Sequence, residues 1–301
     1  MDIAPWYWVV FTLVAAGSQT VRNAMQKELT ATLGTVGATH VRFLFGLPFA
    51  ILFLLIVLGA SGETIQLPGG DLAQAAHGRP GQRFAATALM LAAMRERSFV
   101  VAIALTKIEP LWVALFGIVF LSELLSIGTA AAILVATAGV TIMSWPRKAA
   151  AGAEGWSLRP ALLGIASGAL FGVAAIGYRG GIIALDNPNF VVGATTILAT
   201  GLVFQVVILT TYLLLRDRET MAEIMRAWKP SLFAGFMGAF ASQFWFLAFA
   251  VESAARVRTL ALVEILFAQV VTRNLFRQNV ASREMLGIAL IVVGVILLLN
   301  L

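Results

Sequence analysis

Residues 99–121 read FVVAIALTKIEPLWVALFGIVFL, an apolar run that holds Lys107, Glu109 and Pro110 near its centre. A helix needs roughly 20 apolar residues to cross the hydrocarbon core of a bilayer, and this run supplies them. Charged side chains are costly at that depth, and they are usually placed there for a function. The run therefore predicts a membrane-spanning segment that carries a polar site.

The composition of the whole chain agrees with a membrane protein. Of its 301 residues, 60% are hydrophobic and only 12% are charged, whereas soluble domains carry about 25% charged residues. The net charge of +6 is spread over short loops, which indicates a lipid bilayer as partner and no nucleic acid. The absence of cysteine excludes disulfides and cysteine-based metal sites.

Apolar runs recur along the chain and predict an all-α integral membrane protein with ten spans. The first run lacks the basic start of a signal peptide, so we expect it to be retained. The polar stretches 144–160 and 216–229 are too short to be separate soluble domains. The predicted spans are 6–26, 34–59, 72–94, 99–121, 126–145, 159–180, 189–215, 230–250, 257–276 and 283–300.

The two halves of the chain resemble one another at a constant offset of 155 residues. Residues 109–140 align with 264–295, so that Glu109 meets Glu264 and the apolar spans and the polar break coincide. We expect two five-span repeats, 6–145 and 159–300, joined by a linker at 146–158. Because five is odd, the second repeat enters the membrane in the opposite sense. Inverted repeats are a recurring plan of secondary transporters, with the solute site near the midplane.

Four segments carry a resemblance to a known family. They are HVRFLFGLPFAILFLL (40–55), AAMRERSFVVAIALTKIEPLWVALFGIVFLSELLS (92–126), RTLALVEILFAQVVTRNLF (258–276) and EMLGIALIVVGVILL (284–298). The chain resembles the drug/metabolite transporter superfamily, of the ten-helix type with two EamA-like repeats. This resemblance implies ten helices around a central cavity and export of small organic metabolites, such as amino acids or their analogues, across the bacterial inner membrane.

Two features depart from that family or conflict with it. The first span reads AAGSQTVRNAMQKEL at 15–29, where family members often carry a Trp-Gly motif. The family usually keeps both termini in the cytoplasm, whereas the positive-inside rule favours both termini outside. That count assigns Arg256 and Arg258 to a loop. The orientation therefore stays open.

The third predicted span contains four residues that are unusual in lipid. It is compatible with an interfacial segment, a wet cavity lining or a locally altered sequence. These residues are His77, Arg79, Pro80 and Arg83.

Glu109 and Glu264 are the strongest site candidates because they occupy equivalent mid-span positions. A carboxylate held away from water can exchange a proton near neutral pH, or it can bind a solute ammonium group. The alternative is a structural role in hydrogen bonding to a neighbouring helix. On a continuous helix Lys107 and Glu109 would lie on opposite faces, so each needs a partner from another helix or from a solute. Lys107 could balance an acid, hold a solute carboxylate or reach the interface.

Weaker candidates surround these acids. Pro110 predicts a helix kink, and Trp112 shares the helical face of Glu109, as a cavity wall or as core. Gln19 and Asn23 share a face that would suit a polar cavity. Arg22 and Arg42 favour a boundary role by reaching the interface, and Arg42 is also a site candidate. The remaining candidates for a cavity lining are Tyr178, Gln243, Trp245 and Gln269.

The sequence carries no enzyme signature. It contains no nucleotide-binding loop, zinc-protease motif or serine-hydrolase elbow, and its two histidines, His40 and His77, offer little for a buried catalytic or metal centre. We therefore expect a secondary transporter without a cofactor, moving a small organic solute with protons as the possible coupling ion, as a monomer or weak dimer. The alternatives are a uniporter, a membrane enzyme and a non-transporting scaffold. Gly164, Gly168 and Gly172 predict a close-packing helix face rather than a site.

Overall fold

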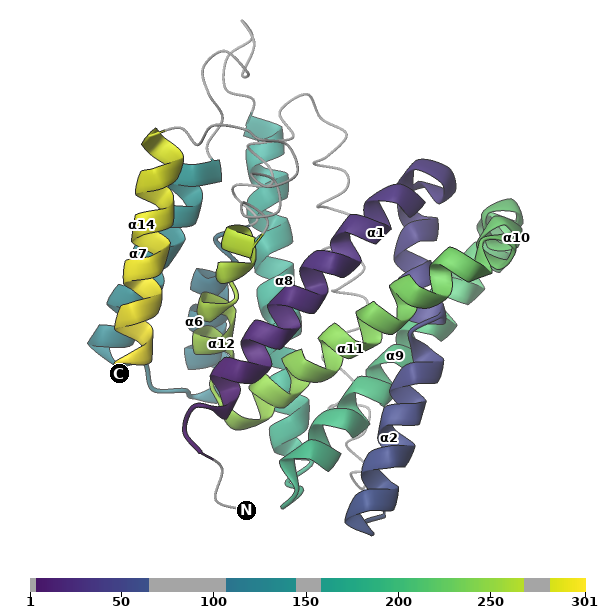
Figure 1. The fold of residues 1–301 in the computed structure, drawn as a ribbon, viewed down its shortest axis with the longest axis horizontal. Helices are drawn as coiled ribbons and strands as arrows, with labels where there is room; N and C mark the ends of the chain where they lie inside the picture. The colour runs from purple at the N-terminus through teal and green to yellow at the C-terminus, as the bar shows by residue number, and fades with distance from the viewer. Residues whose placement is uncertain (1–3, 65–106, 145–157, 268–281) are drawn as a thin grey trace, which may run out of the picture. The chain divides into compact units, whose positions relative to one another are not determined.

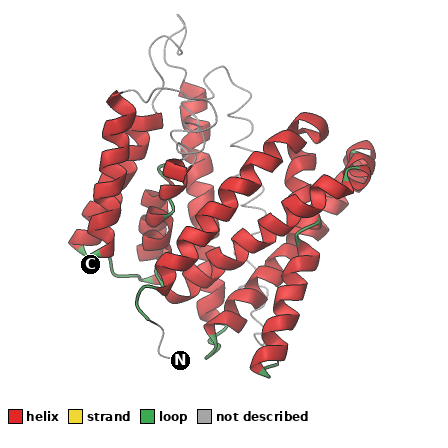
Figure 2. Cartoon of the chain, in the orientation of Figure 1, coloured by secondary structure: helices red, strands yellow, loops and turns green. Residues whose placement is uncertain are grey.

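The computed structural model describes residues 4–64, 107–144, 158–267 and 282–301, and the regular elements within these ranges are α-helices (Figure 2). Predictions on the third span, on the linker as far as residue 157 and on Gln269 fall outside the described residues. The helices are α1 Tyr7–Leu44, α2 Leu47–Ser61, α6 Glu109–Leu121, α7 Ile127–Ser144, α8 Leu158–Ala184, α9 Phe190–Arg216, α10 Arg218–Arg226, α11 Trp228–Val251, α12 Ala254–Leu260 and α14 Ser282–Leu299.

Helix length and composition confirm the membrane character. Among the described residues, five helical segments are long and apolar enough to cross a bilayer. Two shorter apolar helices, Glu109–Leu121 and Ile127–Met143, correspond to the predicted fourth and fifth spans. The five long segments are Val36–Ser61, Gly164–Ala184, Phe190–Arg216, Trp228–Val251 and Ser282–Leu299.

The first two predicted spans meet at a glycine rather than at a loop. Helix α1 runs through both, with a break at Gly34, whose φ of 65° and ψ of −177° lie outside the helical region. Side-chain-bearing residues adopt this conformation only with strain, so glycine suits the position. The second span then continues through a turn at Phe45 and Gly46 into α2, where Pro48 occupies the first turn.

The chain divides into two compact units. Within the described residues, the first unit consists of 4–64 and 178–252, and the second consists of 107–144, 158–177, 253–267 and 282–301. Each unit combines helices from the first and the second half of the sequence. The compact units therefore do not coincide with the two predicted repeats, since each unit takes helices from both halves of the sequence.

In the first unit, α11 packs closely along α1, as Figure 1 shows for the purple and green helices. A β-carbon built on Gly235 of α11 would stand 2.5 Å from the carbonyl carbon of Phe45. Contact this close requires glycine, because any side chain would collide with backbone. The α1–α2 junction is thereby held directly against α11.

In the second unit, α7 and α14 pack through glycines on both helices (Figure 1). A β-carbon on Gly139 would lie 2.6 Å from the carbonyl oxygen of Gly287 and 2.8 Å from the amide nitrogen of Ile291. A β-carbon on Gly294 would lie 2.7 Å from the amide nitrogen of Ala136. Small residues that allow backbones to approach are the usual contact between helices in membranes. Gly172 of α8 has the same role, as the sequence predicts. A β-carbon built on it would lie 3.0 Å from the β-carbon of Trp112 of α6.

We expect Gly139→Ala to destabilise the protein by about 1–3 kcal/mol, because the added methyl group meets backbone atoms that cannot move independently. Thermal unfolding in detergent measures this loss. Gly59→Ala is the matched control, since nothing lies within 4 Å of a β-carbon at Gly59 of α2. Equal unfolding temperatures for the two variants would contradict the proposed glycine contact.

The polar stretch 216–229 contains the short helix α10, whose start is fixed by Asp217. One carboxylate oxygen accepts a hydrogen bond from the Thr220 amide at 3.1 Å, and the other accepts one from the Thr220 hydroxyl at 2.7 Å. These bonds favour the charged carboxylate and lower the pKa of Asp217 below its ordinary value. The stabilisation is therefore present above the ordinary aspartate pKa and is lost as pH falls through the lowered one.

We expect Asp217→Ala to speed amide hydrogen exchange in α10 at neutral pH, because the first turn loses its cap. Exchange followed by mass spectrometry on the peptide that covers residues 216–229 measures the effect. Met225→Ala is the control, since Met225 is exposed on the same helix and far from its cap. Unchanged exchange in Asp217→Ala would show that the cap does not stabilise α10.

Candidate functional site

Both acids of the predicted site lie where a helix begins. Helix α6 starts at Glu109, directly after a turn at Lys107 and Ile108. Helix α12 ends at Leu260, and helical structure resumes at Val263, so that Glu264 also lies in a first turn. A carboxylate near a helix N-terminus interacts favourably with the helix dipole. Two helix breaks therefore place the two acids.

Pro110 occupies the first turn of α6 and does not kink that helix. Proline is well suited to this position, because the first helical amide has no intrahelical partner and the ring fixes φ near its helical value. Within the described residues, the predicted kink is replaced by a helix start.

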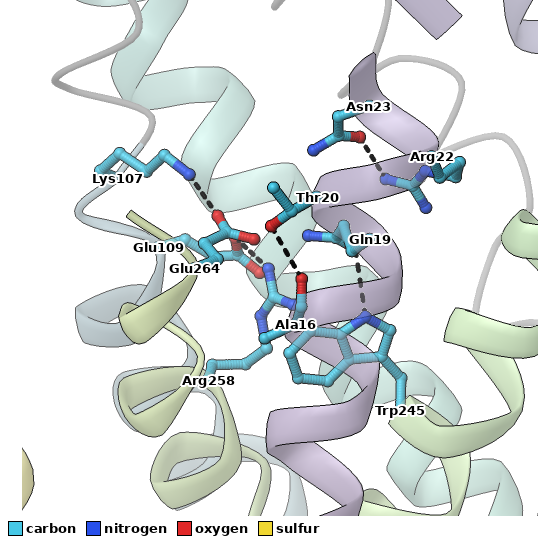
Figure 3. A network of polar contacts seen from close by, with 10 residues as sticks. All are labelled: Ala16, Gln19, Thr20, Arg22, Asn23, Lys107, Glu109, Trp245, Arg258 and Glu264. Atoms are coloured by element: carbon cyan, nitrogen blue, oxygen red, sulfur yellow. Dashed lines mark hydrogen bonds and ion pairs between the residues drawn. The ribbon is translucent and has the colours of Figure 1, made fainter. Parts of the chain in front are cut away.

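The two acids form crossed ion pairs within the second compact unit (Figure 3). The ammonium nitrogen of Lys107 lies 2.5 Å from Oε1 of Glu264. The Nη2 atom of Arg258 lies 2.6 Å from Oε2 of Glu109. Each pair joins the first half of the sequence to the second half. The prediction that Lys107 and Glu109 each require a partner on another segment is confirmed, although Lys107 lies in a turn rather than on the helix that was assumed.

All four charged side chains are largely removed from solvent. The exposed fraction is 30% for Lys107 and 16% for Glu264, and it is 19% for Arg258 and 13% for Glu109. Arg258 also interacts electrostatically with Glu264. Two cations and two anions balance, whereas loss of any one side chain would leave the group with a net charge away from water. The four residues therefore act as one electrostatic unit, which we call the crossed ion pairs.

Arg258 is the residue that sequence reasoning missed. The charge count assigned it to a loop together with Arg256, because both stand at the predicted edge of the ninth span. In the structure both belong to α12, whose apolar side chains are buried. Arg256 donates to the carbonyl oxygen of Leu298 at 3.2 Å. The available signal was the position of Arg258 six residues before Glu264, at the start of an apolar stretch.

Trp112 lies one turn after Glu109, is half-buried and packs against α8. Its ring stacks on Phe116 with centroids 5.6 Å apart, and its β-carbon faces Gly172. The indole Nε1 atom is buried and has no hydrogen-bond partner in the part of the chain that the structure describes. The contacts with Phe116 and Gly172 therefore account for the position of the ring.

The remaining candidates lie in the first unit and form separate hydrogen bonds. Trp245 donates its indole hydrogen to the side-chain oxygen of Gln19 at 3.1 Å, and Asn23 accepts from Arg22 at 2.7 Å (Figure 3). Gln19 and Asn23 are thus bound to different partners, although they were predicted to share a cavity face.

Tyr178 and Gln243 are also hydrogen-bonded between helices of the first unit. The amide of Gln205 donates to the Tyr178 hydroxyl at 2.7 Å, and Gln243 donates to the Thr195 hydroxyl at 2.7 Å. Gln205 and Gln243 are both buried. Buried glutamine bonds of this kind join neighbouring helices in membranes, and Gln205 was not among the predicted residues.

The prediction that Arg22 reaches the membrane boundary is wrong, because Arg22 is buried in the protein. Its δ-carbon and that of Arg42 lie 3.6 and 3.7 Å from the point where a Gly238 β-carbon would stand. Glycine at this position of α11 leaves room for both stems. Arg42 also places its guanidinium over the ring of Phe43, with Cζ 4.7 Å from the centroid.

His40 is fully buried, and its Nε2 atom lies 3.1 Å from the Thr210 hydroxyl. Within the four described ranges, no group of three or more histidine, aspartate or glutamate side chains is placed to hold a metal ion. The crossed ion pairs bring four charged side chains together within the described residues.

Comparisons with known proteins give a fold and no function. No protein-family model matches the chain, and no curated protein sequence matches it either. One solved structure, described only as "Crystal structure of protein", superposes with a TM-score of 0.65 over 96% of this chain and 98% of that chain, at 16% sequence identity. At this identity the likeness concerns the fold alone, and this helical membrane chain shares its fold with a known crystal structure.

Proposed function

We propose that the chain is a secondary transporter of the drug/metabolite superfamily, with ten helices in two inverted repeats. It exports a small organic solute across the bacterial inner membrane by alternating access, coupled to protons. The observation that carries this proposal is the pair of crossed ion pairs, which bring four charged side chains together at two helix breaks. Ionisable groups and interrupted helices at membrane depth are typical of transport sites.

Helix boundaries support the repeat. Helix α7 covers Ile127–Ser144 and α14 covers Ser282–Leu299, and these bounds differ by the same 155 residues that align Glu109 with Glu264. Both acids also lie in the first turn of a helix. The pairing of α7 with α14 and of α6 with α12 brings segments of the two halves into contact.

The chemistry of the crossed ion pairs suits coupled transport. A proton on Glu264 removes the charge that holds Lys107, and a proton on Glu109 does the same for Arg258. Protons and cations therefore compete for the same carboxylates. When a proton or a solute binds, one ion pair can separate. The helices that this pair joins can then adopt a second arrangement, and alternating access requires two such arrangements.

Purified protein in proteoliposomes tests the proposal. A panel of radiolabelled metabolites is offered with and without an imposed pH gradient, and empty liposomes give the background. The proposal expects solute flux that the gradient accelerates, and loss of that acceleration in the Glu109→Gln, Glu264→Gln double variant. Flux that ignores pH in both proteins would identify a uniporter, and no flux with any solute would favour a scaffold.

A further inference from the structure

Of the two ion pairs, the Lys107–Glu264 pair is the easier one to separate. Lys107 lies in the turn before α6, reaches Glu264 with one ammonium group and is 30% exposed. Arg258 stands on α12, whose flanking residues Val257 and Thr259 are fully buried, and its side chain is 19% exposed. A lysine is a point charge on a flexible stem, whereas a guanidinium is a rigid donor. Lys107 can therefore leave its partner at a smaller structural cost.

Charge balance defines what can replace Lys107. When its ammonium group leaves, Glu264 keeps its electrostatic interaction with Arg258, and the net charge of the four residues changes from zero to minus one. A net charge held away from water is costly. One positive charge restores the balance, whereas an anion at the same place would add a second negative charge.

We propose that Lys107 is a tethered competitor of the solute, and that the solute carries a primary ammonium group which displaces the Lys107 ammonium from Glu264. This inference rests on the proposed transport function and names the substrate class of that site. The bond to be replaced is an N–H···O contact of 2.5 Å, so the incoming group must donate hydrogen bonds as well as carry charge. A quaternary ammonium ion satisfies only the second requirement.

A tether makes the competition measurable. An attached group acts at an effective concentration on the order of millimolar, and its removal improves the apparent affinity for a free group of the same chemistry. Lys107→Met retains a long apolar stem and deletes the charge. We expect n-butylammonium to stabilise this variant at concentrations about tenfold lower than the wild type requires.

The experiment follows thermal unfolding of the full chain in detergent during titration with n-butylammonium chloride, with sodium chloride at matched ionic strength. Tetramethylammonium and acetate serve as probes that lack the N–H donors or carry the opposite charge. The Lys107→Met, Glu264→Gln double variant is the matched control, since it is uncharged at both positions. We expect a response to n-butylammonium only, and no response in the double variant.

Equal midpoint concentrations in Lys107→Met and wild type would overturn the inference, as would an undiminished response in the double variant. If Lys107→Met does not fold, Lys107→Arg tests the inference instead. The arginine should bind Glu264 more strongly than the lysine does, so stabilisation should require a higher concentration of n-butylammonium. Binding and flux separate the two proposals. A response to n-butylammonium without solute flux would contradict transport alone, and pH-driven flux that n-butylammonium does not inhibit would contradict the substrate class alone.

Discussion

Arg258→Met is expected to cost about 3–5 kcal/mol of stability, because it leaves Glu109 buried without its cation. Glu109 is 13% exposed and Arg258 is 19% exposed, so solvent compensates little of the loss. We also expect the variant to lose transport, since the crossed ion pairs can no longer open and close as a balanced set. Thermal or denaturant unfolding in detergent measures the first effect, and flux in proteoliposomes measures the second.

Two further variants separate charge balance from packing. Arg256→Met removes an arginine from the same helix. Because Arg256 donates a hydrogen bond to the Leu298 carbonyl, we expect a loss of only about 1–2 kcal/mol. Arg258→Met combined with Glu109→Gln removes both members of the pair and is expected to recover most of the stability without recovering transport. If the double variant is as unstable as Arg258→Met alone, Arg258 stabilises the fold by packing and not by pairing.

Glu264→Gln is expected to uncouple transport from the proton gradient. For exchange of one solute against one proton, each unit of pH difference supports about a tenfold concentration ratio of solute, since one pH unit equals about 1.4 kcal/mol. The glutamine keeps the shape of the side chain and cannot exchange a proton. We therefore expect the steady-state ratio across the proteoliposome membrane not to rise above unity at any imposed pH difference.

Glu264→Asp is the control for this prediction, because it retains the acid on a shorter stem. We expect it to be slower than the wild type and to keep a pH-dependent solute ratio. A Glu264→Gln protein that still accumulates solute in proportion to the pH difference would assign coupling elsewhere, with Glu109 as the next residue to test.

Much of the helical layout could be predicted from hydropathy alone. The predicted spans 189–215, 230–250 and 283–300 agree closely with α9, α11 and α14. Helix breaks were harder to predict, because Pro110 of LTKIEP is a local signal of a break whereas LALVEI is apolar apart from its glutamate. The break before Glu264 has neither proline nor glycine within it, so no local signal of a turn is present.

The acids of the site could be predicted, whereas one of their cations could not. Glu109 and Glu264 stand out because they align between the halves and interrupt apolar runs. Under the offset of 155 residues the position equivalent to Arg258 is Ile103, so the predicted repeat gives no hint of an arginine there. Ion pairing depends on which segments pack together, and that information is absent from the local sequence. The same reason explains why the compact units cut across the predicted halves.

Access to the crossed ion pairs from each side of the membrane is the most direct test of alternating access. The chain has no cysteine, so Ile108→Cys places a single thiol in the turn between Lys107 and Glu109 and leaves all four charges intact. Vesicles of known, opposite orientations are treated with a membrane-impermeant maleimide, with and without n-butylammonium. We predict labelling from both sides, with rates that change in opposite directions when the ammonium is added. Labelling from one side only, at a rate that the ammonium does not alter, would contradict alternating access at this site.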